Sequence, residues 1–419
     1  MRTGIATVPL DYGKCPYWLF ERMKKLSRGI VLAIVEEFGP DEILKRLSNP
    51  VWFQSLGCVL GFDWNSSGLA TTTLGALKEG VRGLESNLGL FICGGKGKTS
   101  RKTPEQIQDW GEFLGYSLEK IDSLIYASKI SAKVDNNAIQ DGFQLYHHNL
   151  IFSKSGQWTV IQQGMNEQIS QARRYHWGSP PDFFQKFEGY DFVEEPHSGI
   201  ISDIRLKPLN LTAKESKENK EVSAGLVREE PKRFLKSIKL ISEKPKTLMN
   251  YPVLKGRGIP FGASYFSGFH PRPKGRDIPA AKIKQKRIKN FTEIELNNVE
   301  FYWHPVVNEK FNLKRLEKTI FFANQQNPKN FEELLSLKGV GPKTIRALSL
   351  VSEIIYGAKP SYEDPARYTF AHGGKDGTPY FVEKDTYDKT IAAIEKGIRI
   401  SKISQKEKLQ ALKRLNSKK

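Results

Sequence analysis

The residues best suited to chemistry are gathered in one stretch, from Asp141 to Trp177, which reads DGFQLYHHNLIFSKSGQWTVIQQGMNEQISQARRYHW. It contains three of the chain's seven histidines. Imidazoles move protons near neutral pH, arginines bind phosphate through paired N–H donors, and a carboxylate can hold a metal ion or orient a histidine. Because cleavage of a phosphodiester uses these groups, we predict a catalytic cluster here. Its members would be Asp141, His147, His148, Gln163, Arg173, Arg174 and His176.

A β-hairpin is expected to position the first of these side chains. Apolar and polar residues alternate on both sides of a Ser-Gly pair at 155–156, which predicts two strands joined by a two-residue turn. Paired positions would then sum to 311, so that His148 faces Gln163 on one side of the hairpin. His147 points to the other side. Each face is apolar near the turn and polar at the open end, where the functional groups would converge.

The residues after the hairpin are expected to form a basic helix, with Arg173 and His176 one turn apart. In a phosphodiesterase, Arg173 and Arg174 would clamp phosphate and either adjacent histidine of the hairpin would act as the base. Asp141 would bind Mg²⁺ or Mn²⁺, or orient a histidine. The alternative is a buried polar network that ties the hairpin to the helix. The sequence leaves both open, because it has no HxxxH or CxxC metal spacing. The hairpin strand also lacks the acidic-x-lysine signature of common nuclease cores, since Gln162-Gln163-Gly164 occupies the equivalent place.

A second candidate site is the turn LKGVGP at residues 337–342, which lies between two short helical patterns. Gly339 and Gly341 allow a tight turn, and the proline suits the first position of a helix. The amides at that helix start attract phosphate, and Lys343 and Thr344 can add contacts. The stretch resembles the helix-hairpin-helix of DNA repair and recombination proteins, which implies binding to the duplex backbone without base readout. The alternative is a plain corner between two helices.

The same stretch resembles part of the base-excision DNA glycosylases. In those enzymes a lysine after the hairpin glycines is the nucleophile and an aspartate further along assists it; Lys343 and Asp364, 21 positions apart, stand in the matching places. The likeness stops there, because those enzymes need several helices before the hairpin to hold the flipped base. A glycosylase/lyase is therefore an alternative to a nuclease.

The positive charge of the chain is concentrated in two segments. The net charge is +19, and the segments 251–290 and 396–419 carry +9 and +8 of it. Clustered basic residues favour a polyanionic partner, which we expect to be DNA or else RNA. The first segment is also rich in Gly and Pro, which predicts a flexible insert.

The remaining composition favours a cytoplasmic protein. The three cysteines, Cys15, Cys58 and Cys93, fit neither a zinc site nor a disulfide framework. No apolar run approaches the length of a membrane span, and the first residues lack the apolar core of a secretion signal. We therefore expect no membrane partner.

Several motifs together resemble one prokaryotic family, catalogued as domain of unknown function 763. They are MRTGIATVPL, WFQSLGCVLGFDWNSSGL, GGKGKTSRKTPE, QDGFQLYHH, WTVIQQGMN, ARRYHW, LKGVGP and FAHGGKDGTP. The resemblance covers nearly the whole chain except the basic insert at 251–290. It implies an archaeal or bacterial protein and supplies no catalytic residues.

These patterns predict a mixed α/β fold of the α+β kind. We expect a mostly helical part at 1–130, a β-hairpin-centred core at 131–205, a charged linker and basic insert at 206–290, and a helix-hairpin-helix region with a basic tail at 291–419. The function we predict is DNA binding in repair or recombination, with a metal-dependent nuclease site. A glycosylase/lyase and a non-enzymatic DNA-structure-binding protein are the alternatives.

Overall fold

The computed structural model divides the chain into two compact units. Unit 1 contains Met1–Lys217, Leu335–Pro342 and Pro360–Lys419, and unit 2 contains Glu218–Leu334 and Lys343–Lys359. The structure describes all residues except 1–3, 11–13, 63–66, 195, 198–199, 202–205, 244–286, 289–290, 293–309, 367–391, 393–394, 401–403 and 417–419. Nearly all of the predicted flexible insert lies outside the described residues. The two units differ from the four successive ranges that the sequence suggests, because two C-terminal segments group with the N-terminal part.

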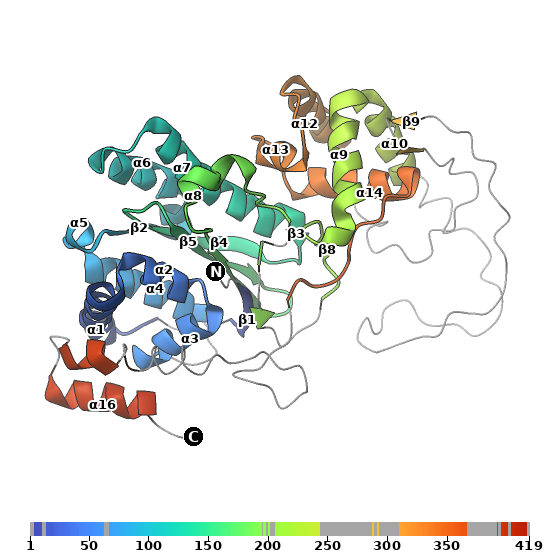
Figure 1. Cartoon of the computed structure of the whole chain (residues 1–419). Helices are drawn as coiled ribbons and strands as arrows, with labels where there is room; N and C mark the ends of the chain where they lie inside the picture. Colours follow the sequence, from blue (N-terminus) through green and yellow to red (C-terminus); the bar gives the residue numbers. More distant parts are fainter. Residues whose placement is uncertain are drawn as a thin grey trace, which may run out of the picture. The chain divides into compact units, whose positions relative to one another are not determined.

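Unit 1 is built on a six-stranded sheet with the strand order β2-β4-β5-β6-β1-β7 (Figure 1). All neighbouring strands are antiparallel except β1 and β7, which are parallel. The strands are β1 Gly4–Pro9, β2 Leu90–Lys96, β4 Gln144–Ser153, β5 Trp158–Asn166, β6 Gln171–Gly178 and β7 Ile200–Ile201. A separate two-stranded sheet pairs β3, Ile139–Gln140, with β8, Leu209–Asn210.

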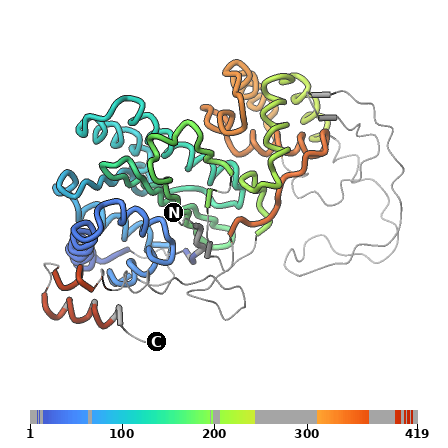
Figure 2. Tube along the Cα trace, in the orientation of Figure 1, coloured from blue at the N-terminus to red at the C-terminus, as the bar shows by residue number. Residues whose placement is uncertain are grey.

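Helices cover both faces of this sheet (Figure 1, Figure 2). The helices α1 to α4 lie against one face, where their apolar side chains form a core with Ile92, Ile151 and Ile161 of the strands. The helices α6 and α7 lie against the other face. The helices of unit 1 are α1 Tyr17–Phe38, α2 Pro40–Leu47, α3 Pro50–Val59, α4 Ser67–Val81, α5 Glu85–Leu88, α6 Thr103–Phe113, α7 Leu118–Lys133, α8 Phe183–Lys186 and α16 Gln405–Asn416. The predicted α+β class is therefore confirmed.

Local sequence signals set several helix ends. The apolar spacing that predicts a helix before Gly39 forms α1, and Gly39 ends it with a φ of 82°. Pro40 then occupies the first turn of α2, where its missing N–H is no loss. Gly115, which adopts a φ of 68°, separates α6 from α7.

Unit 2 is helical. It contains α10 Pro231–Glu243, α12 Leu313–Gln325 and most of α9 Lys217–Glu229, α13 Phe331–Ser336 and α14 Pro342–Tyr356. The segment of α9 was expected to be part of a charged linker, but Val222 and Leu226 are buried and the Asn219 amide donates to the carbonyls of Ser349 and Ala358. The polar composition of α9 conceals one packed face. A short ladder joins β9, Arg287–Ile288, to β10, Phe291–Thr292.

The prediction of a basic helix after the hairpin is wrong, because residues 171–178 form strand β6. Both faces of β6 are buried from Ala172 to Trp177, so the strand lacks the alternation of polar and apolar residues that would distinguish it from a helix.

The hairpin register is also one residue away from the prediction. Phe152 pairs with Trp158, so paired positions sum to 310. Gly156 adopts a φ of 85°, which makes room for a three-residue loop of the bulged type in place of the two-residue turn.

Candidate functional site

The predicted catalytic cluster lies on or beside three neighbouring strands, but its members are divided between the two faces of the sheet. His148 is opposite Gln162, whereas His147 is opposite Gln163, which in turn is opposite Arg174. Paired residues share a face and adjacent residues alternate. The two histidines therefore contact different layers, and the predicted pairing of His148 with Gln163 is wrong.

On the α7 face, His148 belongs to a chain of buried polar side chains. Its Nε2 lies 2.8 Å from the Ser128 hydroxyl, and its Nδ1 lies 2.7 Å from Oε1 of Gln162. The Gln162 amide nitrogen donates to the Ser131 carbonyl at 3.0 Å and to the Asp135 carboxylate. Burial lowers the pKa of His148 below 6.5, although the Gln162 hydrogen bond and the Asp135 charge counter part of this effect. The imidazole is therefore neutral at pH 7.

A cavity of about 210 Å³ lies beside this chain. Ser128 and His148 line it, together with Arg101 and Lys129, whose side chains are exposed. The lining is provided by α7, the start of β4, and the basic segment GGKGKTSRKT around the start of α6. That segment lacks the glycine spacing of a Walker motif, but it contributes the cationic side chain of Arg101 to the lining of a cavity that a serine hydroxyl and an imidazole also line.

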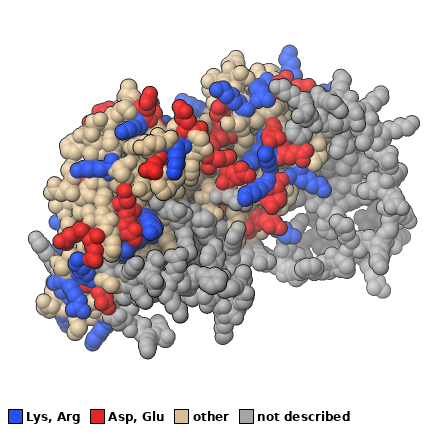
Figure 3. Space-filling model, in the orientation of Figure 1, with Lys and Arg blue, Asp and Glu red and all other residues tan. Residues whose placement is uncertain are grey.

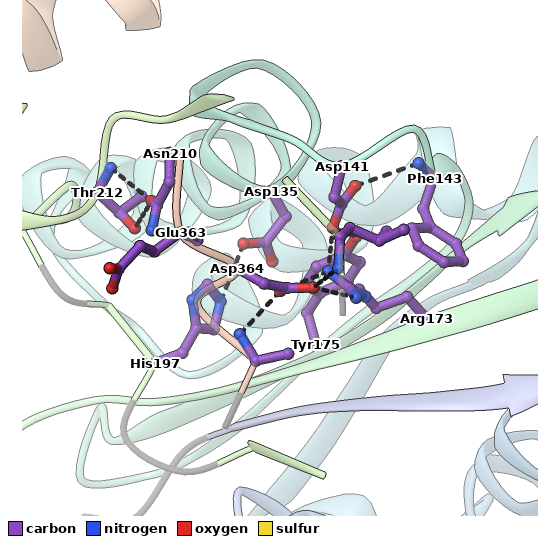
Figure 4. A network of polar contacts seen from close by, with 12 residues as sticks. Asp135, Asp141, Phe143, Arg173, Tyr175, His197, Asn210, Thr212, Glu363 and Asp364 are labelled. Carbon is purple, nitrogen blue, oxygen red and sulfur yellow. Dashed lines mark hydrogen bonds and ion pairs between the residues drawn. The ribbon is translucent and has the colours of Figure 1, made fainter. Parts of the chain in front are cut away.

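Asp141 and Arg173 form a buried ion-pair network (Figure 4). Arg173 donates to Asp141 at 3.0 Å and, with two nitrogens, to both oxygens of Asp364 at 3.0 and 2.9 Å. The Tyr175 hydroxyl and the Phe143 amide also donate to Asp141, at 2.7 and 3.1 Å. Burial lowers the pKa of Arg173, but the two carboxylates more than reverse this, so its pKa lies above the ordinary value.

This network leaves little freedom for the predicted roles. Each oxygen of Asp141 already accepts a hydrogen bond, which does not favour metal binding by Asp141. Arg173 already pairs with two carboxylates, which does not favour a role for Arg173 in binding phosphate. In the same region His197 lies 2.9 Å from the carboxylate of Asp135. The part of the chain that the structure describes contains no group of three His, Cys, Asp or Glu side chains arranged to hold a metal ion.

Arg174 and His176 lie on the opposite face, among α2 and α3. Arg174 donates to His176 Nε2 at 2.8 Å and to the Gln54 side chain at 2.9 Å, and it lies over the Phe53 ring. The other His176 ring nitrogen lies 2.8 Å from the Leu47 carbonyl, to which it must donate. Burial lowers the pKa of Arg174 to about 9. No carboxylate among the described residues pairs with this guanidinium.

His147 shares the face of Arg174 and is 2% exposed. Neither of its ring nitrogens has a hydrogen-bond partner within the described residues. Burial, then the nearby His148 and Lys96, lower the pKa of His147 to about 3. Its neighbour Gln163 donates to the Ser67 carbonyl and to the Tyr146 hydroxyl. An imidazole in this setting is neutral throughout the physiological range.

Lys133, the last residue of α7, binds the glycine turn between α13 and α14. Its ammonium lies 2.8, 2.5 and 3.2 Å from the carbonyl oxygens of Leu335, Leu337 and Val340. Burial lowers the pKa of Lys133 to about 8, and three carbonyl oxygens favour its charged form. The ammonium is therefore mainly charged at pH 7 and donates hydrogen bonds to the carbonyl oxygens on the inner side of the turn.

The four residues predicted to contact nucleic acid lie in and after this turn. Gly339 is exposed and has a φ of 90°, and no atom lies within 4 Å of where a Cβ of Gly339 or Gly341 would be. Lys343 is exposed in the first turn of α14. Thr344 is only 7% exposed, which does not favour a contact with phosphate.

Sequence reasoning missed Ser128, Gln162, Asp135 and Lys133. A signal for the first and third was present: Ser128, Ser131 and Asp135 recur at helical spacing in an otherwise apolar pattern. No local signal shows that Lys133 contacts a turn about two hundred positions later. Its three bonds span separations of 202 to 207 residues.

The fold and these clusters define a mixed α+β protein whose central sheet carries buried polar networks on both faces. The chain belongs to the family described as Protein of unknown function (DUF763), whose sequence model matches residues 4–382. No curated protein and no solved structure matches it. No helix among the described residues is long and apolar enough to cross a membrane.

Proposed function

We propose that this protein binds duplex DNA through its phosphodiester backbone, using the turn between α13 and α14. The observation that carries the proposal is the Lys133 ammonium, which lies within 3.2 Å of three carbonyl oxygens on the inner side of that turn. A half-buried cation that binds the carbonyl oxygens of several peptide groups fixes the direction of those groups. This arrangement is more than a plain corner between two helices requires.

The consequence for the outer side of the turn follows from peptide geometry. In a trans peptide the N–H points away from the C=O. Since the carbonyls of Leu337 and Val340 point toward Lys133, the amides of Lys338 and Gly341 point away from it. The α14 N-terminus adds the positive end of a helix dipole. The outward amides, the start of α14 and the exposed Lys343 ammonium in its first turn together favour the binding of an anion such as a backbone phosphate.

Two further observations support a polyanionic partner. The turn resembles the helix-hairpin-helix of DNA repair proteins, and the segments 251–290 and 396–419 carry 17 of the 19 net positive charges. On the face that Figure 3 shows, Lys and Arg are mixed with Asp and Glu. The described residues on that face therefore do not form a broad basic surface. RNA would offer the same phosphate contacts.

The test is a salt titration of DNA affinity with two matched lysine variants. Duplex affinity, followed by fluorescence anisotropy, is expected to fall by about 10³ between about 50 and 200 mM salt if roughly six phosphates are contacted. Lys343→Ala should weaken binding and lower the salt slope by about 1. Lys314→Ala is the control. Lys314 is the exposed second residue of α12, as Lys343 is of α14, and its substitution removes the same charge. A flat salt response, or equal effects of the two variants, would overturn the proposal.

Cleavage by a metal-dependent nuclease stays a prediction, and the same DNA samples test it when Mg²⁺, Mn²⁺ or a chelator is added. The described donor set does not favour it, because Asp141 is bound to Arg173. The glycosylase/lyase alternative has less support, since both oxygens of Asp364 are bound to Arg173. Borohydride trapping of a Schiff base on Lys343 would establish that alternative.

A further inference from the structure

We propose that Ser128 is a nucleophile and His148 its general base, and that the cavity they line takes phosphodiesters. The inference goes beyond the proposed DNA binding and does not depend on it, because a small phosphodiester is enough to occupy the site. Two observations support the inference. The first is the direction of the hydrogen bonds that link Asp135, Gln162, His148 and Ser128. The second is the cavity that Ser128 and His148 line.

The direction of the hydrogen bonds is fixed at the Gln162 end. The Ser131 carbonyl and the Asp135 carboxylate only accept, so the Gln162 amide nitrogen must face them. The Gln162 oxygen then faces His148, whose Nδ1 must carry the proton. The His148 Nε2 is left as an acceptor, and the Ser128 hydroxyl donates to it at 2.8 Å. A neutral imidazole that accepts from a serine hydroxyl, and is itself oriented by a third group, is the arrangement that activates a serine.

The cavity supplies what a purely structural pair would lack. Ser128 and His148 are buried, but both line the open volume of about 210 Å³. A site of this size is much larger than the space of one water molecule. Arg101 and Lys129 on the same lining favour an anionic substrate and would stabilise charge on phosphate oxygens. The lowered pKa of His148 keeps the imidazole in its basic form at neutral pH.

The reaction would proceed in two displacements at phosphorus. The Ser128 Oγ forms a bond to phosphorus while the bond to the leaving alkoxide breaks; the Ser128 proton passes to His148 Nε2 and from there to the alkoxide, which leaves as an alcohol. Water then attacks the phosphoserine diester and gives a proton to His148 Nε2. The Oγ–P bond breaks, Ser128 takes that proton back, and a phosphomonoester is released. Gln162 and Asp135 act as positioning residues, because they reach the substrate only through His148.

The first test is covalent labelling of the intact chain with a fluorophosphonate, in which Ser128 Oγ would displace fluoride. Mass spectrometry of the digested protein is expected to place the adduct on Ser128. The variant Ser128→Ala should lose the adduct, whereas Ser123→Ala should keep it. Ser123 is the matched control, since it is an equally buried serine of the same helix that is not part of the cavity lining. An adduct on another residue, or none on the folded parent, would overturn the assignment.

The second test is turnover of bis(4-nitrophenyl) phosphate, which needs no DNA-binding surface. Hydrolysis should fall at least about 10²-fold in His148→Ala, and at least as far in Ser128→Ala. The variant Gln162→Glu should shift the pH profile to higher pH, because a carboxylate beside Nδ1 raises the imidazole pKa; a merely structural glutamine predicts an unshifted profile. Turnover of 4-nitrophenyl acetate without turnover of the phosphodiester would overturn the substrate class. Failure of these assays with intact DNA binding would sink this inference and leave the proposed function in place.

Discussion

Replacing His147 by leucine is expected to remove a specific part of the acid sensitivity of this protein. The His147 imidazole has a folded pKa of about 3 against an ordinary value of 6.5. Since the pKa is lower in the folded state, the unfolded chain binds more protons between these two values. The free energy of unfolding must therefore fall as the pH falls below 6.5. Leucine never binds the proton, so the variant lacks this contribution.

The size of the effect follows from the two pKa values. At pH 5 the unfolded imidazole is about 97% protonated and the folded one about 1%, which by linkage costs the native state about 2 kcal/mol; at pH 7.5 the cost is about 0.1 kcal/mol or less. The result depends little on the folded pKa as long as that value lies well below 5. The parent should therefore lose about 2 kcal/mol more stability than His147→Leu between these two pH values.

The assay is urea unfolding of both proteins at pH 5.0 and 7.5, followed by tryptophan fluorescence. Trp158 and Trp177 are fully buried on the central sheet, so they report the unfolding of unit 1. The shifted pKa values of His148 and His176 occur in both proteins and cancel in the difference. The reasoning is refuted if the two proteins lose the same stability, or if the His147 imidazole titrates above pH 5 in the NMR spectrum of the folded parent.

Two further predictions concern the turn and the buried ion pairs. Gly339→Ala should cost about 1 kcal/mol or more in stability because of the positive φ at this position, whereas Gly341→Ala, at a position without positive φ, should unfold like the parent; thermal melting compares them, and equal melting temperatures would contradict the strained turn. Arg173→Met should cost about 3–5 kcal/mol because it leaves two buried carboxylates unpaired. Arg82→Met breaks only an exposed pair and should cost at most about 1 kcal/mol; urea unfolding of both variants measures the difference, and similar costs would show that the buried network is not stabilising.

Local patterns in the sequence were sufficient for several elements. The apolar spacing before Gly39 predicts α1 and its end, because helix formation and termination depend on residues within a few positions of one another. The turn at 337–342 and the two helices around it follow for the same reason. The position of the hairpin at 144–166 is also readable from alternation. The residues predicted to form the catalytic cluster lie in or beside the strands β4, β5 and β6.

Tertiary structure decided the partners of those residues. One extra residue in the loop, allowed by the left-handed Gly156, moves the register by one, and this gives His148 the partner Gln162 in place of Gln163. Both faces of β6 are buried, so its residues lack the simple alternation that would mark a strand. Arg173 finds Asp364 across 191 positions of the chain, a pairing that no local period encodes. The sequence by itself therefore determined which polar groups are present and in which elements most of them lie. Only packing of distant segments decided which of them are bound in ion pairs and which line a cavity, because strand register and long-range contacts depend on the whole chain.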